Sequence, residues 1–155
     1  MQNKNIQSIY RLSPIQEGIL YQCLKSPDAG YYHSQFSCRL DNLKDAEKWQ
    51  HVWAKIIEQH AVLRTFFTWE KRDQPLQIVR HRVQLPWQSF DWSNDSEQHN
   101  EQQWSGLKRR DKDLGFNLSK APLIRFSFIK TGPESYLFLM SFHHILLDGW
   151  SQVLL

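Results

Sequence analysis

Apolar residues recur at intervals of three and four positions in two parts of the chain, and this spacing predicts two amphipathic helices. The first is predicted from Pro14 to Lys25. Its start carries a capping signal, since Ser13 can cap the helix and Gln16 stands where a capping box has Glu or Gln. The second is predicted from Lys44 to His60, with a pattern typical of a helix packed against a sheet. The residues that recur at this spacing are Ala46, Trp49, Val52, Trp53, Ile56, Ile57 and His60.

Five other segments alternate apolar and polar residues or are rich in β-forming residues, so they predict strands. These segments are Tyr31–Leu40, Thr65–Glu70, Leu76–Arg82, Ala121–Lys130 and Ser135–His144. A turn at residues 27–30 precedes the first strand. Polar linkers at residues 71–75 and 131–134 join the remaining strands in pairs, and the first linker is predicted to close a hairpin.

The tract from Asp91 to Glu101 is polar and predicts a loop that leads into a helix near Gln102 to Asp113. The last residues, Gly149 to Leu155, predict the beginning of another helix. Helices that alternate with clustered hairpins predict an α/β fold, a two-layer sandwich in which a mixed β-sheet is packed with helices. Because domains seldom stop one turn into an apolar helix, we expect something that would cover this last segment to be missing.

The bulk composition narrows the class of protein. A chain of 155 residues with 41% hydrophobic and 23% charged residues has room for one domain with a packed core. The formal charge of +3 is too small to predict nucleic acid or an anionic membrane as a partner. No apolar run approaches the roughly 18 residues that a membrane span needs. Two cysteines outside any CxxC pair and a polar N-terminus indicate a reducing cytoplasm.

The densest cluster of chemically capable residues is His143-His144-Ile145-Leu146-Leu147-Asp148-Gly149-Trp150, where a predicted strand gives way to a loop and a helix. Successive strand side chains point to opposite faces, so we expect one of His143 and His144 to face a cleft and the other the body of the protein. A single imidazole could accept a proton from an attacking amine or hydroxyl. Asp148 could orient that imidazole or pair with a distant arginine. The backbone N–H of Gly149 could approach a substrate oxygen at a helix N-terminus.

Taken alone, a histidine at a strand end is more often a structural residue than a catalyst, so both interpretations stay open at this point. The other histidines show no spacing typical of metal ligands. They are His33, His51, His60, His81 and His99. We therefore predict no metal site.

The segment from His143 to Ser151 resembles the HHxxxDGWS signature of the condensation domains of nonribosomal peptide synthetases, within the chloramphenicol acetyltransferase-like superfamily. Three further stretches are similar to motifs of the same family in order and spacing. Residues 12–20 resemble its opening motif, residues 61–67 its LRTxF motif and residues 116–125 its FDLxxxPLxR stretch. The resemblance covers practically the whole chain and implies a lobe with a chloramphenicol acetyltransferase-like fold.

Carried over residue by residue, the resemblance implies that His144 is the catalytic histidine and that Gly149 brings its backbone to the reaction tunnel. His143 and Asp148 would then be structural. Arg64 would form an ion pair with Asp148 that holds the loop in shape. Removing one partner of such a desolvated pair commonly costs about 3–5 kcal/mol.

The resemblance also implies a reaction and its partners. The complete enzyme of this family has two similar lobes, with a tunnel entered by the phosphopantetheine arms of donor and acceptor carrier proteins. The acceptor amine attacks the donor thioester carbonyl, and the domain itself binds no cofactor. Residues 1–155 would be the N-terminal lobe only, and the C-terminal lobe and an adjacent adenylation domain would be its partners. We expect the lobe alone not to condense aminoacyl thioesters appreciably.

Two other classes of function stay open. The first is a non-catalytic module that only docks a carrier protein or another protein partner. The second is a small homo-oligomeric acetyltransferase of the chloramphenicol acetyltransferase type, in which a neighbouring copy of the chain completes the site. In that enzyme His144 would activate a hydroxyl of a small molecule.

Overall fold

Seven strands form two separate sheets in a computed structural model that describes residues 5–149 and 151. The larger sheet has four strands in the order β2-β7-β6-β5, and the smaller has three in the order β1-β4-β3. The larger sheet comprises β2 (His33–Leu40), β7 (Tyr136–His143), β6 (Ile124–Lys130) and β5 (Trp87–Asp91). The smaller sheet comprises β1 (Ile6–Arg11), β4 (Leu76–Arg80) and β3 (Thr65–Thr68).

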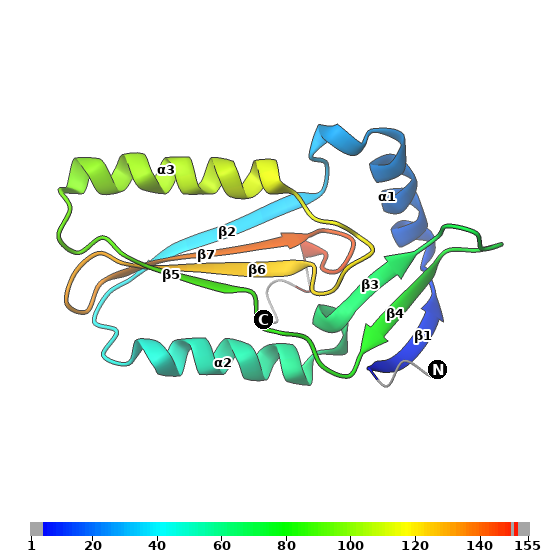
Figure 1. The fold of residues 1–155 in the computed structure, drawn as a ribbon, viewed down its shortest axis with the longest axis horizontal. Coiled ribbons are helices and arrows are strands. Elements are labelled where there is room, and N and C mark those ends of the chain that lie inside the picture. Colours follow the sequence, from blue (N-terminus) through cyan, green and yellow to red (C-terminus); the bar gives the residue numbers. More distant parts are fainter. Residues whose placement is uncertain (1–4, 150, 152–155) are drawn as a thin grey trace.

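The larger sheet is mixed, because β5 pairs with β6 in parallel while the other neighbours are antiparallel. Two long helices run along its opposite sides (Figure 1). They are α2 (Ala46–Gln59) and α3 (Glu97–Leu114). A third helix, α1 (Pro14–Lys25), lies beside the smaller sheet, and short 3-10 turns follow α1 at Pro27–Ala29 and α2 at Ala61–Arg64.

Alternate residues of the larger sheet face the two helices. On one face, Trp53 of α2 packs against Phe126 and Phe138, with ring centroids 4.8 Å and 5.5 Å away. On the other face, Leu107 of α3 packs into a smaller core with Ile129. Large aromatic side chains bury much apolar area and dominate core energetics, so these three rings help to hold α2 on the sheet.

Helix α1 has the predicted bounds, and its capping box is confirmed. The Ser13 hydroxyl accepts from the Gln16 N–H, and the Gln16 side chain accepts in return from the Ser13 N–H. Helix α2 is also confirmed, beginning two residues later than predicted because Asp45 caps it by accepting from the Lys48 N–H. The predicted hairpin is confirmed by the antiparallel pairing of β3 with β4.

The polar tract was expected to be a loop as far as Glu101, and this is wrong. Helix α3 already begins at Glu97, because Ser96 caps it through its hydroxyl, which accepts from the His99 N–H. Strands β1 and β5 had no counterpart in the sequence prediction. Phe36 of β2 is 50% exposed, and β2 is an edge strand of the larger sheet.

The predicted α/β class, a mixed sheet packed with helices, is confirmed by this architecture. The layers differ from a simple two-layer sandwich, since helices cover both faces of the larger sheet and a second sheet lies beyond it. The helix predicted from Gly149 lies mostly outside the described residues, which include only Gly149 and Ser151 of it. Among the described residues, no helix is long and apolar enough to cross a bilayer.

Candidate active site

His143 and His144 lie where β7 ends, and their backbones are fixed from both sides. The N–H of His143 donates to the carbonyl of Leu123, at 3.0 Å, just before β6. The N–H of His144 donates to the carbonyl of Tyr32, at 2.8 Å, just before β2. Tyr32 has a φ of 64°, a left-handed conformation uncommon for a residue with a side chain. The two histidines are therefore held by the strands that flank β7.

His143 is buried and its ring is fixed. Its Nδ1 accepts from the N–H of Ile145 at 3.2 Å, so the proton of the neutral ring is on Nε2, which lies 3.6 Å from the Sγ of Cys23. Burial, with smaller contributions from the nearby charges of His33 and His144, lowers the pKa of His143 to about 4. His143 is therefore neutral at pH 7.

Cys23 and His143 do not form an activated nucleophile. Burial raises the pKa of the Cys23 thiol, while the pKa of His143 is lowered. A thiolate–imidazolium pair needs the opposite shifts. Both groups therefore stay neutral, and their contact is a hydrogen bond between two uncharged side chains.

His144 is half-buried and starts the turn that leaves β7. The three residues after it, Ile145, Leu146 and Leu147, are buried and anchor the turn in the main core. The side chain of Gln16 also reaches this turn, donating to the carbonyl of Ile145 at 3.3 Å. The opening motif of α1 thus supports the loop that carries His144.

Asp148 directly precedes Gly149 and Ser151, both of which are helical. The carboxylate of Asp148 accepts from the N–H and the hydroxyl of Ser151, at 2.8 Å and 2.6 Å, as a helix-capping residue does. Gly149 is exposed, and no described side chain or backbone atom lies within 4 Å of where a Cβ would be. Its φ is not left-handed, unlike those of Gly30 and Gly115. The conformational freedom of glycine is therefore not needed at this position.

Arg64 is anchored by backbone carbonyls, and the ion pair with Asp148 that the resemblance implied stays a prediction. Its guanidinium is buried and donates to Ile57 O at 3.1 Å, to Gln7 Oε1 at 2.7 Å, and to the carbonyls of Arg80 and His81. The free carbonyls at the C-terminal end of α2 attract a cation there, so Arg64 ties α2 to the smaller sheet.

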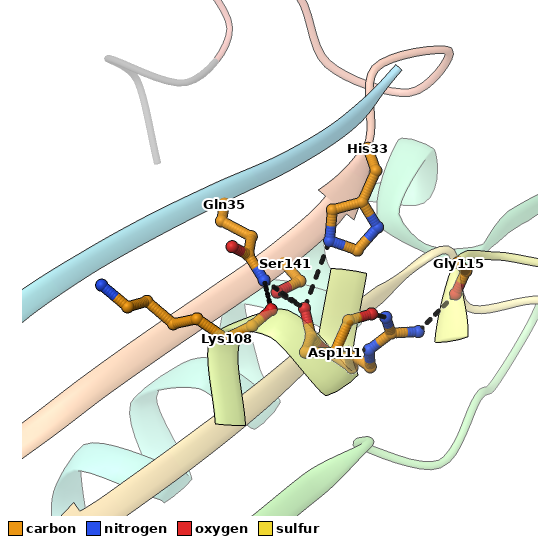
Figure 2. A network of polar contacts seen from close by, with 7 residues as sticks. His33, Gln35, Lys108, Asp111, Gly115 and Ser141 are labelled. Atoms are coloured by element: carbon orange, nitrogen blue, oxygen red, sulfur yellow. Dashed lines mark hydrogen bonds and ion pairs between the residues drawn. The ribbon is translucent and has the colours of Figure 1, made fainter. Parts of the chain in front are cut away.

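A second polar cluster, which the sequence analysis did not find, lies on the α3 face of the larger sheet (Figure 2). Its centre is the carboxylate of Asp111 in α3. Oδ2 accepts from His33 Nε2 at 3.2 Å, from Gln35 Nε2 at 2.7 Å and from the Ser141 hydroxyl. The cluster joins α3 to both β2 and β7.

Arg125 in β6 completes this cluster. Its guanidinium forms an ion pair with the carboxylate of Asp111 and also donates to the backbone carbonyls of Asp111 and Gly115. The same guanidinium lies 4.2 Å from the ring centroid of Phe116, within cation–π range. Burial raises the pKa of Asp111, but the hydrogen bonds from His33, Arg125, Ser141 and Gln35 outweigh it and hold that pKa well below its usual range.

A cavity of about 640 Å³ adjoins this cluster. It lies between the end of α1, the start of β2 and residues 112–118, and His33 and His143 both line it. His144 is not among the described residues that line this cavity. Within residues 5–149 and 151, no group of three or more His, Cys, Asp or Glu side chains is placed to hold a metal ion.

The comparison with protein families decides the class of this chain. The sequence profile of the condensation domain family matches residues 6–155. The chain belongs to that family. The HHxxxDG segment and the other three motifs therefore identified the family correctly from the sequence.

Curated relatives of this chain include peptide synthetases. The chain is 36% identical over 147 residues to "Gramicidin S synthase 2" of Brevibacillus brevis, a match that covers 95% of this chain and 3% of that protein. It is 33% identical over 147 residues to "Tyrocidine synthase 2" of Brevibacillus parabrevis, covering 95% of this chain and 4% of that protein. The chain thus spans a few per cent of the length of the relatives it matches.

Solved condensation domains share its fold. The starter condensation domain of rhizomide synthetase RzmA superimposes with a TM-score of 0.81 at 21% identity, over 96% of this chain and 36% of that one. The four-domain nonribosomal peptide synthetase AB3403 superimposes with a TM-score of 0.78 at 21% identity, over 94% of this chain and 11% of that one. These likenesses confirm the expected condensation-domain fold.

Proposed function

We propose that this member of the condensation domain family contributes the reactive histidine for peptide-bond formation between two amino acids held as thioesters. The nitrogen of the acceptor amine attacks the donor carbonyl, the C–N bond forms and the C–S bond breaks. The amine loses a proton and the departing sulfur leaves as a thiol. The observation that supports this best is the placement of His144, half-buried on a turn that is fixed by Tyr32 and anchored by Ile145 to Leu147.

We assign the chemical step to His144 rather than to His143. His143 is buried, its Nδ1 is engaged by the Ile145 N–H, and its pKa is lowered, so it is poorly placed to exchange a proton with substrate. His144 would hold or deprotonate the acceptor amine as it attacks, a contribution typically of about 10²–10⁴-fold in rate. Gly149 would offer its backbone to the oxygen of the tetrahedral intermediate from the start of the terminal helix.

The partners follow from the proposed reaction. Donor and acceptor carrier proteins would present the two amino acids on phosphopantetheine arms, and the domain would bind no cofactor of its own. An adenylation domain would load the carriers, and the reaction would take place in the cytoplasm. Holding both tethered reactants in line can supply effective molarities on the order of 10⁵ M or more.

We further propose that residues 1–155 form the first of two lobes. The chain matches about a third of the solved RzmA domain, 36% of its length, so other parts of that domain have no counterpart here. A second lobe would supply the other wall of the reaction channel beside His144. The chain alone would then not condense aminoacyl thioesters appreciably.

The proposal is tested by exchanging lobes. This chain replaces the matching segment of a condensation domain of gramicidin S synthase 2, and the product on the acceptor carrier is measured by mass spectrometry. Dipeptide is expected from the exchanged domain and none from the isolated chain. A folded exchanged domain that makes no dipeptide from loaded carriers would contradict the proposal, as would turnover by the isolated chain.

A further inference from the structure

Tyr32 has a backbone conformation that a residue of its type rarely adopts. Its φ of 64° lies in the left-handed region, where a bulky residue is a genuine outlier. The other described non-glycine residues with a positive φ are Asn42 and Lys71, and both are exposed. Tyr32 is instead half-buried and packs against the main core. Backbone strain of this kind costs free energy and clusters at functional sites, so Tyr32 is expected to have a local role.

The backbone of Tyr32 fixes that of His144. Strand β2 begins at His33, which lies opposite His143 of β7, so Tyr32 and His144 are one residue beyond the last pair of this ladder. There the Tyr32 carbonyl accepts from the His144 N–H at 2.8 Å. This bond extends the pairing of the two strands to the residue that carries the proposed chemistry. The position of the His144 backbone therefore depends on the left-handed conformation of Tyr32.

The ring of Tyr32 also contacts the imidazole of His144. The two ring centroids are 6.5 Å apart and the ring planes meet at 63°, an edge-to-face arrangement that aromatic pairs favour. The ring of Tyr32 lies at a similar distance, 6.3 Å, from that of His143. His143 is itself buried and held by the Ile145 N–H. The Tyr32 ring thus contacts one fixed imidazole and one half-buried imidazole, and restricts the rotation of the second.

We propose that Tyr32 is a positioning residue for the proposed reaction, with its carbonyl fixing the backbone of His144 and its ring orienting the imidazole. The inference rests on the proposed function, because Tyr32 acts on the reaction only through His144. Placement of a catalytic group matters steeply, since a misplacement of about 1 Å can cost on the order of 10²-fold in rate. The carbonyl and the ring carry both contacts, so the hydroxyl of Tyr32 is dispensable.

Three variants separate the ring of Tyr32 from its backbone. Tyr32→Phe keeps both and loses only the hydroxyl. Tyr32→Asn removes the ring, while asparagine is among the residues that tolerate the left-handed conformation. Tyr32→Val disfavours that conformation, because a β-branched residue is an outlier there. Tyr10→Asn, which replaces a 55% exposed tyrosine of β1, is the matched control.

NMR of the full chain measures the positioning without any catalysis. In the wild type, nuclear Overhauser contacts are expected between the ring protons of Tyr32 and His144. Tyr32→Asn should shift the ring resonances of His144, because the ring current of Tyr32 is lost. Tyr32→Val should make the His144 amide proton exchange about tenfold faster, because the strained backbone opens more readily. Tyr32→Phe and Tyr10→Asn should leave the His144 signals and the exchange rate unchanged.

The lobe-exchanged domain measures the consequence for the reaction. With loaded carriers, Tyr32→Asn is expected to slow the single-turnover step about two- to tenfold, the fold-change that corresponds to one aromatic pair. The dependence of the rate on acceptor carrier concentration should stay the same, because Tyr32 acts on His144 and not on carrier binding. Tyr32→Phe should keep the wild-type rate.

Unmoved His144 resonances in Tyr32→Asn, or a wild-type rate for that variant, would each overturn the proposal. So would a Tyr32→Phe rate as low as that of Tyr32→Asn, because the hydroxyl would then be the active group. Absence of the Overhauser contacts in the wild type would overturn it even if a variant fails to fold. Shifted His144 resonances in Tyr32→Asn, together with no dipeptide from the folded wild-type exchanged domain, would refute the proposed function and leave the positioning of His144 by Tyr32 standing.

Discussion

His33 and His143 lie directly opposite each other where β2 pairs with β7. The ring of Phe116 packs against both, with centroids 5.4 Å from His33 and 6.4 Å from His143. The nearby charge of His33 disfavours protonation of His143. The pairing therefore favours a neutral His143 beside the residue to which we assign the chemistry.

The buried His143 predicts a pH dependence of stability. Its pKa is about 4 in the folded chain and about 6.5 when exposed, so between these values the unfolded chain binds the extra proton. The stabilisation from the neutral ring is complete above pH 6.5 and is lost as the pH falls towards 4. His143→Asn, which keeps an oxygen to accept from the Ile145 N–H, removes this titration. Urea unfolding at about pH 7.5 and about pH 4.5 should show a larger loss of stability for wild type than for His143→Asn, and equal losses would contradict the assignment.

Replacing the Asp111 carboxylate by an amide is predicted to lower the stability of the chain strongly. Asp111→Asn leaves Arg125 without its anionic partner in a site where the carboxylate side chain is 8% exposed, and it should lower the free energy of unfolding by about 3 kcal/mol. Asp113→Asn, two residues on and exposed, is the control and should change it by less than about 0.5 kcal/mol. Chemical denaturation of the two variants decides the point, and similar values for both would refute the role of the cluster.

The backbone conformation of Gly115, which lines the cavity, predicts that a side chain at this position destabilises the chain. Its φ of 57° and ψ of −158° lie in a region open essentially to glycine alone. Gly115→Ala should therefore destabilise the chain by about 1–3 kcal/mol. Gly18→Ala, inside α1 with open space around it, should instead stabilise by about 0.5–1 kcal/mol. Thermal unfolding should show a lower melting temperature for Gly115→Ala and a higher one for Gly18→Ala. An unchanged melting temperature for Gly115→Ala would be inconsistent with the positive φ of Gly115.

A double-mutant cycle tests the ion pair between Arg64 and Asp148 that the resemblance implied. Arg64→Ala removes donors to three backbone carbonyls and should cost about 3 kcal/mol, whereas Asp148→Ala removes a helix cap and should cost about 1 kcal/mol. If the two residues pair, the cost of the double variant should differ from the sum of the single costs by more than about 0.5 kcal/mol. Costs that add to within that value would contradict the ion pair.

The sequence predicted the elements whose signals are local. The bounds of α1 follow from Ser13, Pro14 and Gln16, which act within one turn, and α2 follows from the regular spacing of its apolar face. Strand β5 was missed because most of its residues are exposed and do not alternate, so nothing within the segment marks it as a strand. Its partner β6 lies more than thirty residues away along the chain.

In the candidate site, too, the features set by neighbouring residues were predictable and the long-range contacts were not. The motif from His143 to Gly149 is contiguous, so its resemblance to a family was visible in the sequence. The contact of His33 with Asp111 spans 78 positions and depends on how α3 docks on the sheet. The pairing of His33 with His143 depends on the register of β2 against β7, which no pattern within either strand indicates. The acceptors of Arg64 are backbone carbonyls, which no residue pattern identifies.

His144 is the proposed reacting residue, and a single-turnover rate tests this role most directly. The lobe-exchanged condensation domain is mixed with loaded donor and acceptor carriers, and dipeptide formation is followed by rapid quench for wild type, His144→Ala and His51→Ala. His51 is an exposed histidine on α2 and serves as the matched control. We expect His144→Ala to slow the step by about 10²–10⁴-fold while His51→Ala keeps the wild-type rate. Dipeptide formation by His144→Ala at the wild-type rate would contradict the account.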